Sequence, residues 1–171
     1  MSVEAAYTSE DGTLTCSLTY EPLDVARVTE WVGADEAGAL GLFIGTTRNS
    51  FQGKKVRRLE YEAYSKLAMR TMIEVLEDAR TMTDDLMHRT PSHAPASFSQ
   101  LRPSKTPSSL IKLALHHRLG SVPVGQPSIV IAVSSPHRKE AFVACEWILE
   151  ETKKRVQVWK KEVYDTRRRH D

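Results

Sequence analysis

The chain has 171 residues, of which 40% are hydrophobic and 27% are charged, and its formal net charge is +2. This composition is typical of a soluble globular domain, and the near-neutral charge is not typical of a nucleic-acid-binding protein. No apolar run approaches the ~20 residues that span a bilayer, and the N-terminal MSVEAAYTSEDGT lacks the basic and apolar segments of a secretory signal. We therefore expect one cytoplasmic domain over residues 1–171, with no membrane or nucleic-acid partner.

Cysteine and histidine positions argue against a metal centre. Cys16 and Cys145 lie too far apart in the sequence to indicate a zinc motif or a disulfide framework. Cys145 falls in an apolar helical pattern, which is typical of a buried thiol without chemical function. His88, His93 and His116 show no metal-ligand spacing. We expect no metal and no cofactor.

Strand patterns dominate the first third of the chain. Residues 13–20 alternate polar and apolar side chains and predict an edge strand, after which Pro22 fits the first turn of a helix. The apolar run GALGLFIGTT at 38–47 predicts a buried strand. The polar RNSFQGKK then leads into VRRLEYEAY at 56–64. We expect these two strands to form a hairpin with a long, basic tip.

A helix and an irregular segment follow. Ser65 is a candidate N-cap for the helix KLAMRTMIEVLEDAR, whose apolar residues recur at helical spacing. From Thr81 the apolar period ends, and residues 81–108 are rich in Pro, Ser and Thr. Such a composition predicts a disordered insertion. At the other end of the chain, residues 165–171 predict a basic tail.

The last third returns to regular patterns. LIKLALHHRLG at 110–120 and SIVIAVSS at 128–135 predict strands. Ser135 and Pro136 indicate the start of a long helix that runs to about Val156. VQVWKKEVY then predicts a short closing strand. Adjacent strands mixed with helices in this order favour an α+β domain.

Both ends of the long helix carry cations. His137 and Arg138 lie in its first turn, where the helix dipole disfavours positive charge. A helix N-terminus with free N–H groups, a histidine and an arginine is suited to binding an anion. Arg138 begins a stripe that runs through Phe142, Cys145 and Leu149, and Lys153 ends it. The alternative is that Lys153 and Lys154 only complement the negative end of the helix dipole, while Arg138 extends its charged group into solvent.

Two further cations complete a possible anion site. Arg48 follows the glycine-rich strand, and Lys160 follows Trp159 in the closing strand. Together with the helix cations they suit a phosphorylated small molecule, and a lysine kept away from water by Trp159 could act as an acid, base or nucleophile. The alternative is that Arg48 is solvated surface and Trp159 only packs against its own sheet.

Three segments of this sequence resemble the large, catalytic subunit family of molybdopterin synthase. They are GLFIGTTRNS, HHRLGSVPVGQPSIVIAVSSPHRKEAF and KKRVQVWKKE, in this order, and SPHR and the last segment are the most specific parts. The resemblance covers roughly residues 15–164 except 81–108, an insertion outside the common core of the family. The chain also ends soon after Tyr164, where members of the family continue.

The resemblance implies a sulfurtransferase that converts cyclic pyranopterin monophosphate to molybdopterin by installing two dithiolene sulfurs. The sulfur would come from a thiocarboxylate on the C-terminal Gly-Gly of a small, ubiquitin-like partner subunit, so neither cysteine of this chain would carry it. The implied fold is an α/β hammerhead-like domain with an additional antiparallel β region. The implied assembly is a homodimer of large subunits that binds two small subunits, a heterotetramer.

Carried over by position, the resemblance also implies a set of site residues. Two lysines are expected to be catalytic, and they belong to a wider substrate-binding group. The catalytic pair is Lys153 and Lys160, and the substrate-binding group is Arg48, His137, Arg138, Lys153, Lys160, Lys161 and Glu162.

Helix geometry adds an expectation about assembly. His137 and Lys153 are sixteen residues apart, which corresponds to about 24 Å along one straight helix at ~1.5 Å per residue. We therefore expect each site to combine the two lysines of one subunit with His137 and Arg138 of another. Two alternatives to this enzyme remain: a non-catalytic adaptor that binds an anionic partner or nucleic acid through its basic patch, and a stand-alone sulfurtransferase that uses Cys145.

Overall fold

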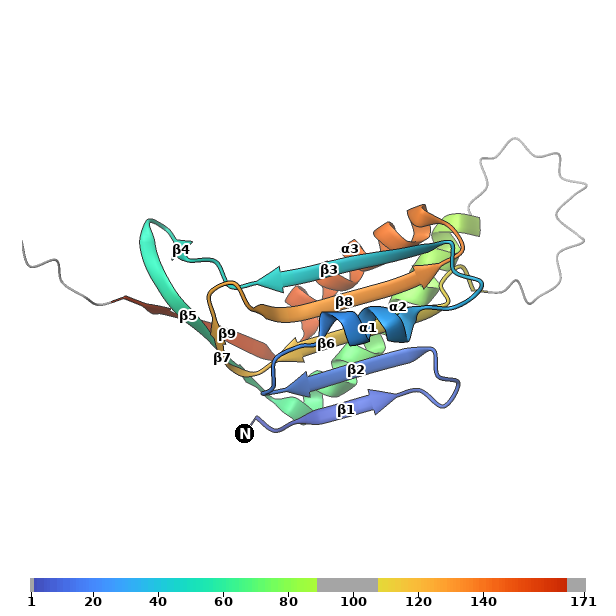
Figure 1. Cartoon of the computed structure of the whole chain (residues 1–171). Helices are drawn as coiled ribbons and strands as arrows, with labels where there is room; N and C mark the ends of the chain where they lie inside the picture. The colour runs from blue at the N-terminus through green and yellow to red at the C-terminus, as the bar shows by residue number, and fades with distance from the viewer. Residues whose placement is uncertain (1, 89–107, 166–171) are drawn as a thin grey trace, which may run out of the picture.

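The computed structural model describes residues 2–88 and 108–165, which form three helices and nine strands (Figure 1). In this part of the chain, no helix is both long and apolar enough to cross a membrane. The predicted α+β class is confirmed. The helices are α1 (Val25–Val32), α2 (Ser65–His88) and α3 (Arg138–Arg155); the strands are β1 (Ala5–Thr8), β2 (Leu14–Thr19), β3 (Ala39–Thr46), β4 (Ser50–Phe51), β5 (Lys54–Ala63), β6 (Lys112–Arg118), β7 (Gly120–Pro123), β8 (Pro127–Ser135) and β9 (Val158–Tyr164).

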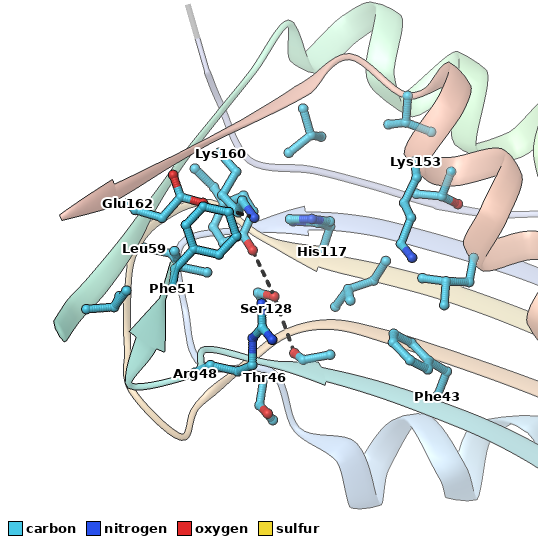
Figure 2. A pocket seen from close by; sticks show the side chains of 18 of the residues that line it. Phe43, Thr46, Arg48, Phe51, Leu59, His117, Ser128, Lys153, Lys160 and Glu162 are labelled. Atoms are coloured by element: carbon cyan, nitrogen blue, oxygen red, sulfur yellow. Dashed lines mark hydrogen bonds and ion pairs between the residues drawn. The ribbon is translucent and has the colours of Figure 1, made fainter. Parts of the chain in front are cut away.

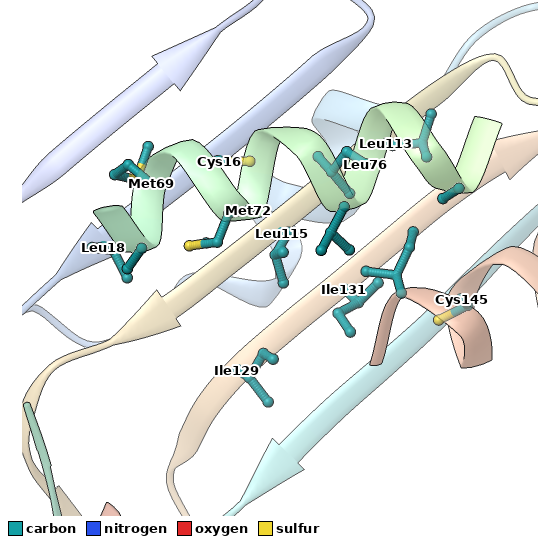
Figure 3. Packing of buried hydrophobic residues seen from close by; sticks show 14 of the residues in the cluster. Cys16, Leu18, Met69, Met72, Leu76, Leu113, Leu115, Ile129, Ile131 and Cys145 are labelled. Atoms are coloured by element: carbon teal, nitrogen blue, oxygen red, sulfur yellow. The ribbon is translucent and has the colours of Figure 1, made fainter. Parts of the chain in front are cut away.

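The larger sheet has five strands in the order β1-β2-β6-β8-β3. All neighbours are antiparallel except β2 and β6. Helices α2 and α3 cover one face and α1 covers the other (Figure 1). Because β8 is covered on both faces, it reads as a continuous apolar run: Ile131 packs under α2 and α3, and Val130 packs under α1. Figure 3 shows Met72 and Leu76 of α2 over Leu115 and Ile131.

The smaller sheet is built around β5, which is ten residues long and pairs with β4, β7 and β9. All three pairings are antiparallel. This sheet lies at one end of the larger one, beyond the last residues of β3 (Figure 1). It is the additional antiparallel β region that the sequence resemblance implied.

Two strand predictions are wrong. Residues 14–19 do not form an edge strand, because β1 pairs along β2 and occupies the edge. The apolar run at 39–46 is not buried on both faces: β3 is itself an edge, and Leu40, Leu42 and Ile44 are 39%, 42% and 41% exposed. The expected hairpin is also wrong, since β3 pairs with β8 and the tight hairpin joins β4 to β5.

Helix α2 is longer than its apolar period predicts. It continues past Thr81 to His88, so the predicted disorder is wrong for residues 81–88, and residues 89–107 lie outside the described part of the chain. Thr83 is fully buried and donates its hydroxyl to the Ala79 carbonyl. Asp84 accepts hydrogen bonds from the backbone and hydroxyl of Ser109. These contacts tie the last turns of α2 to the segment that leads into β6.

The start of α2 also differs from the prediction. Ser65 is the first helical residue and not the N-cap, because the Tyr64 carbonyl accepts from Ala68 N. The Ser65 hydroxyl instead accepts from Val3 N at 2.8 Å. The side chain therefore ties the N-terminal segment to the helix.

Helix α3 packs unusually close to β3 because position 41 is glycine. A Cβ on Gly41 would lie 2.6 Å from the Ala141 carbonyl oxygen, so any larger residue would push the helix away. The helix begins at Arg138 with His137 as N-cap and ends at Arg155 with Val156 as C-cap, close to the end that its sequence predicts. This contact sets how closely the first turn of α3 approaches the start of β3.

Both cysteines are buried, as expected for Cys145. Cys16 is 1% exposed and Cys145 is 5% exposed. Burial raises the pKa of the Cys16 thiol to about 12, helped by the charge of Glu77, and burial raises that of Cys145 to about 11. Neither thiol is positioned to act as a nucleophile at neutral pH.

Candidate functional site

A cavity of about 490 Å³ lies where the end of β3, strands β5 and β9, and the last turns of α3 meet (Figure 2). This volume suits a small-molecule ligand. Three cationic side chains, Arg48, Lys153 and Lys160, line it together with Glu162. Most of the rest of its lining consists of apolar and hydroxyl side chains, among them Phe43, Thr46, Phe51, Leu59, Tyr61, Ser128, Leu149 and Val158.

Alternation along β9 decides which of its residues reach the cavity. Lys160 and Glu162 line it, whereas Lys161 and Trp159 do not, because successive side chains of a strand point to opposite faces. Trp159 is 59% exposed and borders a separate hollow with Ser2 and Tyr64. The prediction that Trp159 shields the lysines is therefore wrong.

Lys160 is held by neighbours on its own side of the sheet. Its Nζ lies 3.2 Å from Glu162 Oε1 and 5.8 Å from the centre of the Phe51 ring. The hydrogen bond from Lys160 lowers the pKa of the Glu162 carboxyl, so Glu162 is ionised at neutral pH. Phe51, from the β4–β5 hairpin, takes the place beside Lys160 that the sequence suggested for Trp159.

Lys153 and Lys154 occupy the same turn of α3 but differ in what they face. Each pairs with the carboxylate three residues earlier, Lys153 with Glu150 at 3.4 Å and Lys154 with Glu151 at 3.1 Å. Their side chains are 62% and 64% exposed, and such surface pairs contribute little to stability. Lys153 lines the cavity and Lys154 does not.

The position of Arg48 is set by the preceding residue, Thr47, which is held in place by hydrogen bonds. Thr47 is buried, donates its hydroxyl to the Val122 carbonyl at 3.3 Å and exchanges backbone hydrogen bonds with Gly125 and Gln126. Gly45, two residues earlier, lets Ile129 pack closely against the strand, since a Cβ there would lie 2.6 Å from Ile129 Cγ2. Arg48 therefore leaves the strand end at the mouth of the cavity.

His137 and Arg138 lie at the opposite end of α3 from Lys153, and neither lines the cavity. The helix is one unbroken element of 18 residues, so about 24 Å separates the two backbones at ~1.5 Å per residue. His137 caps the helix without a side-chain hydrogen bond, while its carbonyl accepts from the Ser135 hydroxyl at 2.6 Å. Within this single chain, the predicted site residues are therefore not all together: four line the cavity, His137 and Arg138 lie at the far end of α3, and Lys161 lies on the other face of β9.

His117, which no sequence pattern indicated, lies in the cavity and is only 7% exposed. Its ring meets the edge of Tyr61 at 4.9 Å between centroids. The neighbouring His116 points to the other face of β6, where its Nδ1 lies 2.8 Å from the Ser17 hydroxyl. Alternation in HHRLG could have separated the two histidines, but the sequence did not indicate which face held the cavity.

Burial of these two histidines predicts acid sensitivity of the fold. Burial lowers the pKa of His116 to about 4, with a contribution from Arg27, and burial lowers that of His117 to about 4. As pH falls below about 6.5, the unfolded chain therefore binds these protons first. The free energy of unfolding should decrease between about pH 6.5 and pH 4, by on the order of 3 kcal/mol for each histidine.

Urea unfolding of the wild type, His116→Gln and His117→Gln at several pH values checks this prediction. Each variant should show a flatter decline than the wild type over that pH range. Three parallel pH curves would contradict it, because the decline would then come from other groups.

Among residues 2–88 and 108–165, no group of three or more His, Cys, Asp or Glu side chains could hold a metal ion. The chemistry of the cavity is thus that of three cations, one carboxylate and one buried imidazole. Such a set suits an anionic ligand that also carries polar, uncharged groups.

Comparison with known proteins gives the family. A profile of the MoaE protein family matches residues 18–155. This chain belongs to the MoaE family, the family of molybdopterin synthase catalytic subunits. The resemblance predicted from the sequence is confirmed. The molybdopterin synthase catalytic subunit of Culex quinquefasciatus is 42% identical over 147 residues, which are 86% of this chain and 78% of that protein.

Solved structures agree with the MoaE assignment. The crystal structure of molybdopterin synthase from Staphylococcus aureus superimposes with a TM-score of 0.68 at 27% identity, over 87% of this chain and 90% of that one. A complex of subunits 1 and 2 of molybdopterin-converting factor from Helicobacter pylori contains the same fold, with a TM-score of 0.58 at 21% identity over 91% and 92% of the two chains. The predicted α/β hammerhead-like fold is thereby supported.

Proposed function

We propose that this MoaE-family chain is the sulfur-transferring subunit of a molybdopterin synthase and acts on cyclic pyranopterin monophosphate. The observation that carries the proposal is the convergence of Arg48, Lys153 and Lys160 on one cavity of ligand size. The phosphate of this substrate and the thiocarboxylate that would donate sulfur are both anions. Three cations beside a single carboxylate, Glu162, leave a net positive site for them.

Sulfur would reach the cavity on a partner protein. The proposed donor is a small, ubiquitin-like subunit whose C-terminal Gly-Gly ends in a thiocarboxylate, and a fold of this kind occurs in a complex of two subunits. An extended tail of two glycines is slender enough to enter beside Lys160. The burial and raised pKa of Cys16 and Cys145 support a mechanism in which neither thiol carries sulfur.

The separation of the site residues supports a site shared between two copies of this chain. His137 and Arg138 lie near the start of β3, where Gly38 N donates to the Ser135 carbonyl, and the cavity lies at the end of β3 with Thr46. If the exposed β3 edges of two copies pair antiparallel, the start of one strand lies opposite the end of the other. His137 and Arg138 of one copy then approach the cavity of its neighbour.

Surface composition is consistent with this pairing. Leu40, Leu42 and Ile44 are exposed along the β3 edge, and Phe142 on α3 is 63% exposed. An unpaired edge strand with apolar side chains tends to pair with another chain. In such a homodimer the two α3 helices lie antiparallel on the same face of a continuous sheet, and with two small subunits the assembly is a heterotetramer.

Reconstitution tests the proposed function. The chain is mixed with cyclic pyranopterin monophosphate and a small subunit that ends in a thiocarboxylate, and formation of a dithiolene product is measured. We expect product with the thiocarboxylate and none with the same partner ending in an ordinary carboxylate. Binding of duplex DNA in a salt-sensitive manner without any dithiolene product would instead favour the adaptor alternative.

A further inference from the structure

The innermost part of the cavity is uncharged, in contrast to its mouth. His117, Tyr61 and Ser128 are all less than 10% exposed, whereas the side chains of Lys153 and Lys160 are 62% and 46% exposed. Figure 2 shows the imidazole of His117 between the two lysines. Cations thus lie at the mouth, and an imidazole and two hydroxyls lie deeper.

The hydrogen bond of His117 determines which ring nitrogen is available. Its Nδ1 lies 2.8 Å from the Arg118 carbonyl oxygen. Because a carbonyl oxygen can only accept, Nδ1 carries the proton and Nε2 has a free lone pair. Burial, which lowers the pKa of His117 to about 4, keeps the ring neutral at neutral pH.

The two hydroxyl protons beside His117 are already used within the protein. Ser128 donates to the Gly45 carbonyl at 3.3 Å, and Tyr61 donates to the Ser128 hydroxyl at 3.2 Å. These hydroxyls therefore retain accepting capacity only. The deep part of the cavity presents acceptors to a ligand, whereas the mouth presents cationic donors.

We propose that His117 Nε2 accepts a hydrogen bond from an N–H or O–H group on the uncharged, heterocyclic part of the ligand and so determines ligand specificity. The inference rests on the proposed function, in which the ligand is cyclic pyranopterin monophosphate and its reduced pterin ring supplies N–H donors. The cations at the mouth hold the phosphate, and His117 selects the ring. A ligand that has a phosphate but no N–H or O–H group for His117 would bind only to the cations at the mouth of the cavity.

Binding measurements with two probes test this division. Asparagine at 117 can keep the donor to the Arg118 carbonyl but does not reach the position of Nε2, whereas glutamine does reach it. We expect His117→Asn to weaken binding of cyclic pyranopterin monophosphate about tenfold, as for one lost hydrogen bond in a dry site. His117→Gln should lose less than about threefold, and competition by inorganic phosphate should be unchanged in both.

His116→Asn is the matched control, because it alters an equally uncharged, neighbouring histidine that does not line the cavity. It should bind both probes like the wild type. Equal pterin affinity in His117→Asn and the wild type would overturn the inference while leaving the proposed function intact. A wild-type protein that does not bind the pterin would contradict the proposed function itself.

A measurement on the unaltered chain covers the case in which His117→Asn does not fold. With ¹⁵N-labelled histidine, the unprotonated Nε2 resonance of His117 should shift when the pterin is added and stay in place when inorganic phosphate is added. A resonance that does not move at saturating pterin would overturn the inference, because an acceptor in contact with the ligand must respond.

Discussion

Lys153→Ala and Lys160→Ala should each lower the rate of dithiolene formation by a factor on the order of 100 or more. Both ammonium groups line the cavity, where two anions must approach each other for sulfur to be transferred. Removing one cation therefore raises the free energy of the complex in which the two anions lie next to each other in the cavity. Turnover at saturating pterin and thiocarboxylated partner is the measurement, with stability checked by thermal unfolding.

Lys154→Ala is the control that separates this effect from a general loss of charge. Lys154 lies in the same helical turn, has nearly the same exposure and makes the same type of ion pair as Lys153, but does not line the cavity. It should retain nearly wild-type turnover, and all three variants should keep their stability within about 1 kcal/mol. Equal damage from Lys154→Ala and Lys153→Ala in folded proteins would refute the assignment.

Much of the local structure was predictable because its signals are local. The long apolar run of β8 requires cover on both faces, and α3 begins and ends where its sequence indicates. The three cations that line the cavity, Arg48, Lys153 and Lys160, also lie in the segments that the sequence singled out. The alternation of side chains along β9 would also have predicted which of its residues share a face. It places Lys160 and Glu162 on one face and Trp159 and Lys161 on the other.

Other features depend on contacts that a linear pattern does not contain. Helix α2 extends beyond its apolar period because Thr83 is buried with its hydroxyl satisfied by Ala79, and Asp84 binds Ser109. His117 packs against Tyr61 of β5, which is far from it in sequence. The β3 run reads as buried although one of its faces is exposed in a single chain, which is what a strand covered only in a dimer would show.

Mixing a Lys153→Ala chain with an Arg138→Ala chain should restore activity that neither has alone. In a hybrid dimer, one site combines Lys153 of the second chain with Arg138 of the first, and both are intact. Random association gives hybrids in about half of the dimers with one working site in two, so about one quarter of wild-type activity is expected. Dithiolene formation after the two proteins are denatured and refolded together is the measurement.

The decisive control for this experiment is a mixture of Lys153→Ala with Lys160→Ala. Because both lysines line the cavity of the same chain, every hybrid site then lacks one of them, and no activity should return. Suppose that activity returns when Lys153→Ala is mixed with Arg138→Ala but not when it is mixed with Lys160→Ala. This result would assign the two lysines of a site to one subunit and Arg138 to the other. Absence of recovery in both mixtures, with hybrid dimers demonstrated by mass spectrometry, would mean that Arg138 acts within its own chain or outside the site. The ~24 Å between the ends of α3 would then have to be spanned by the ligand and the partner's tail together.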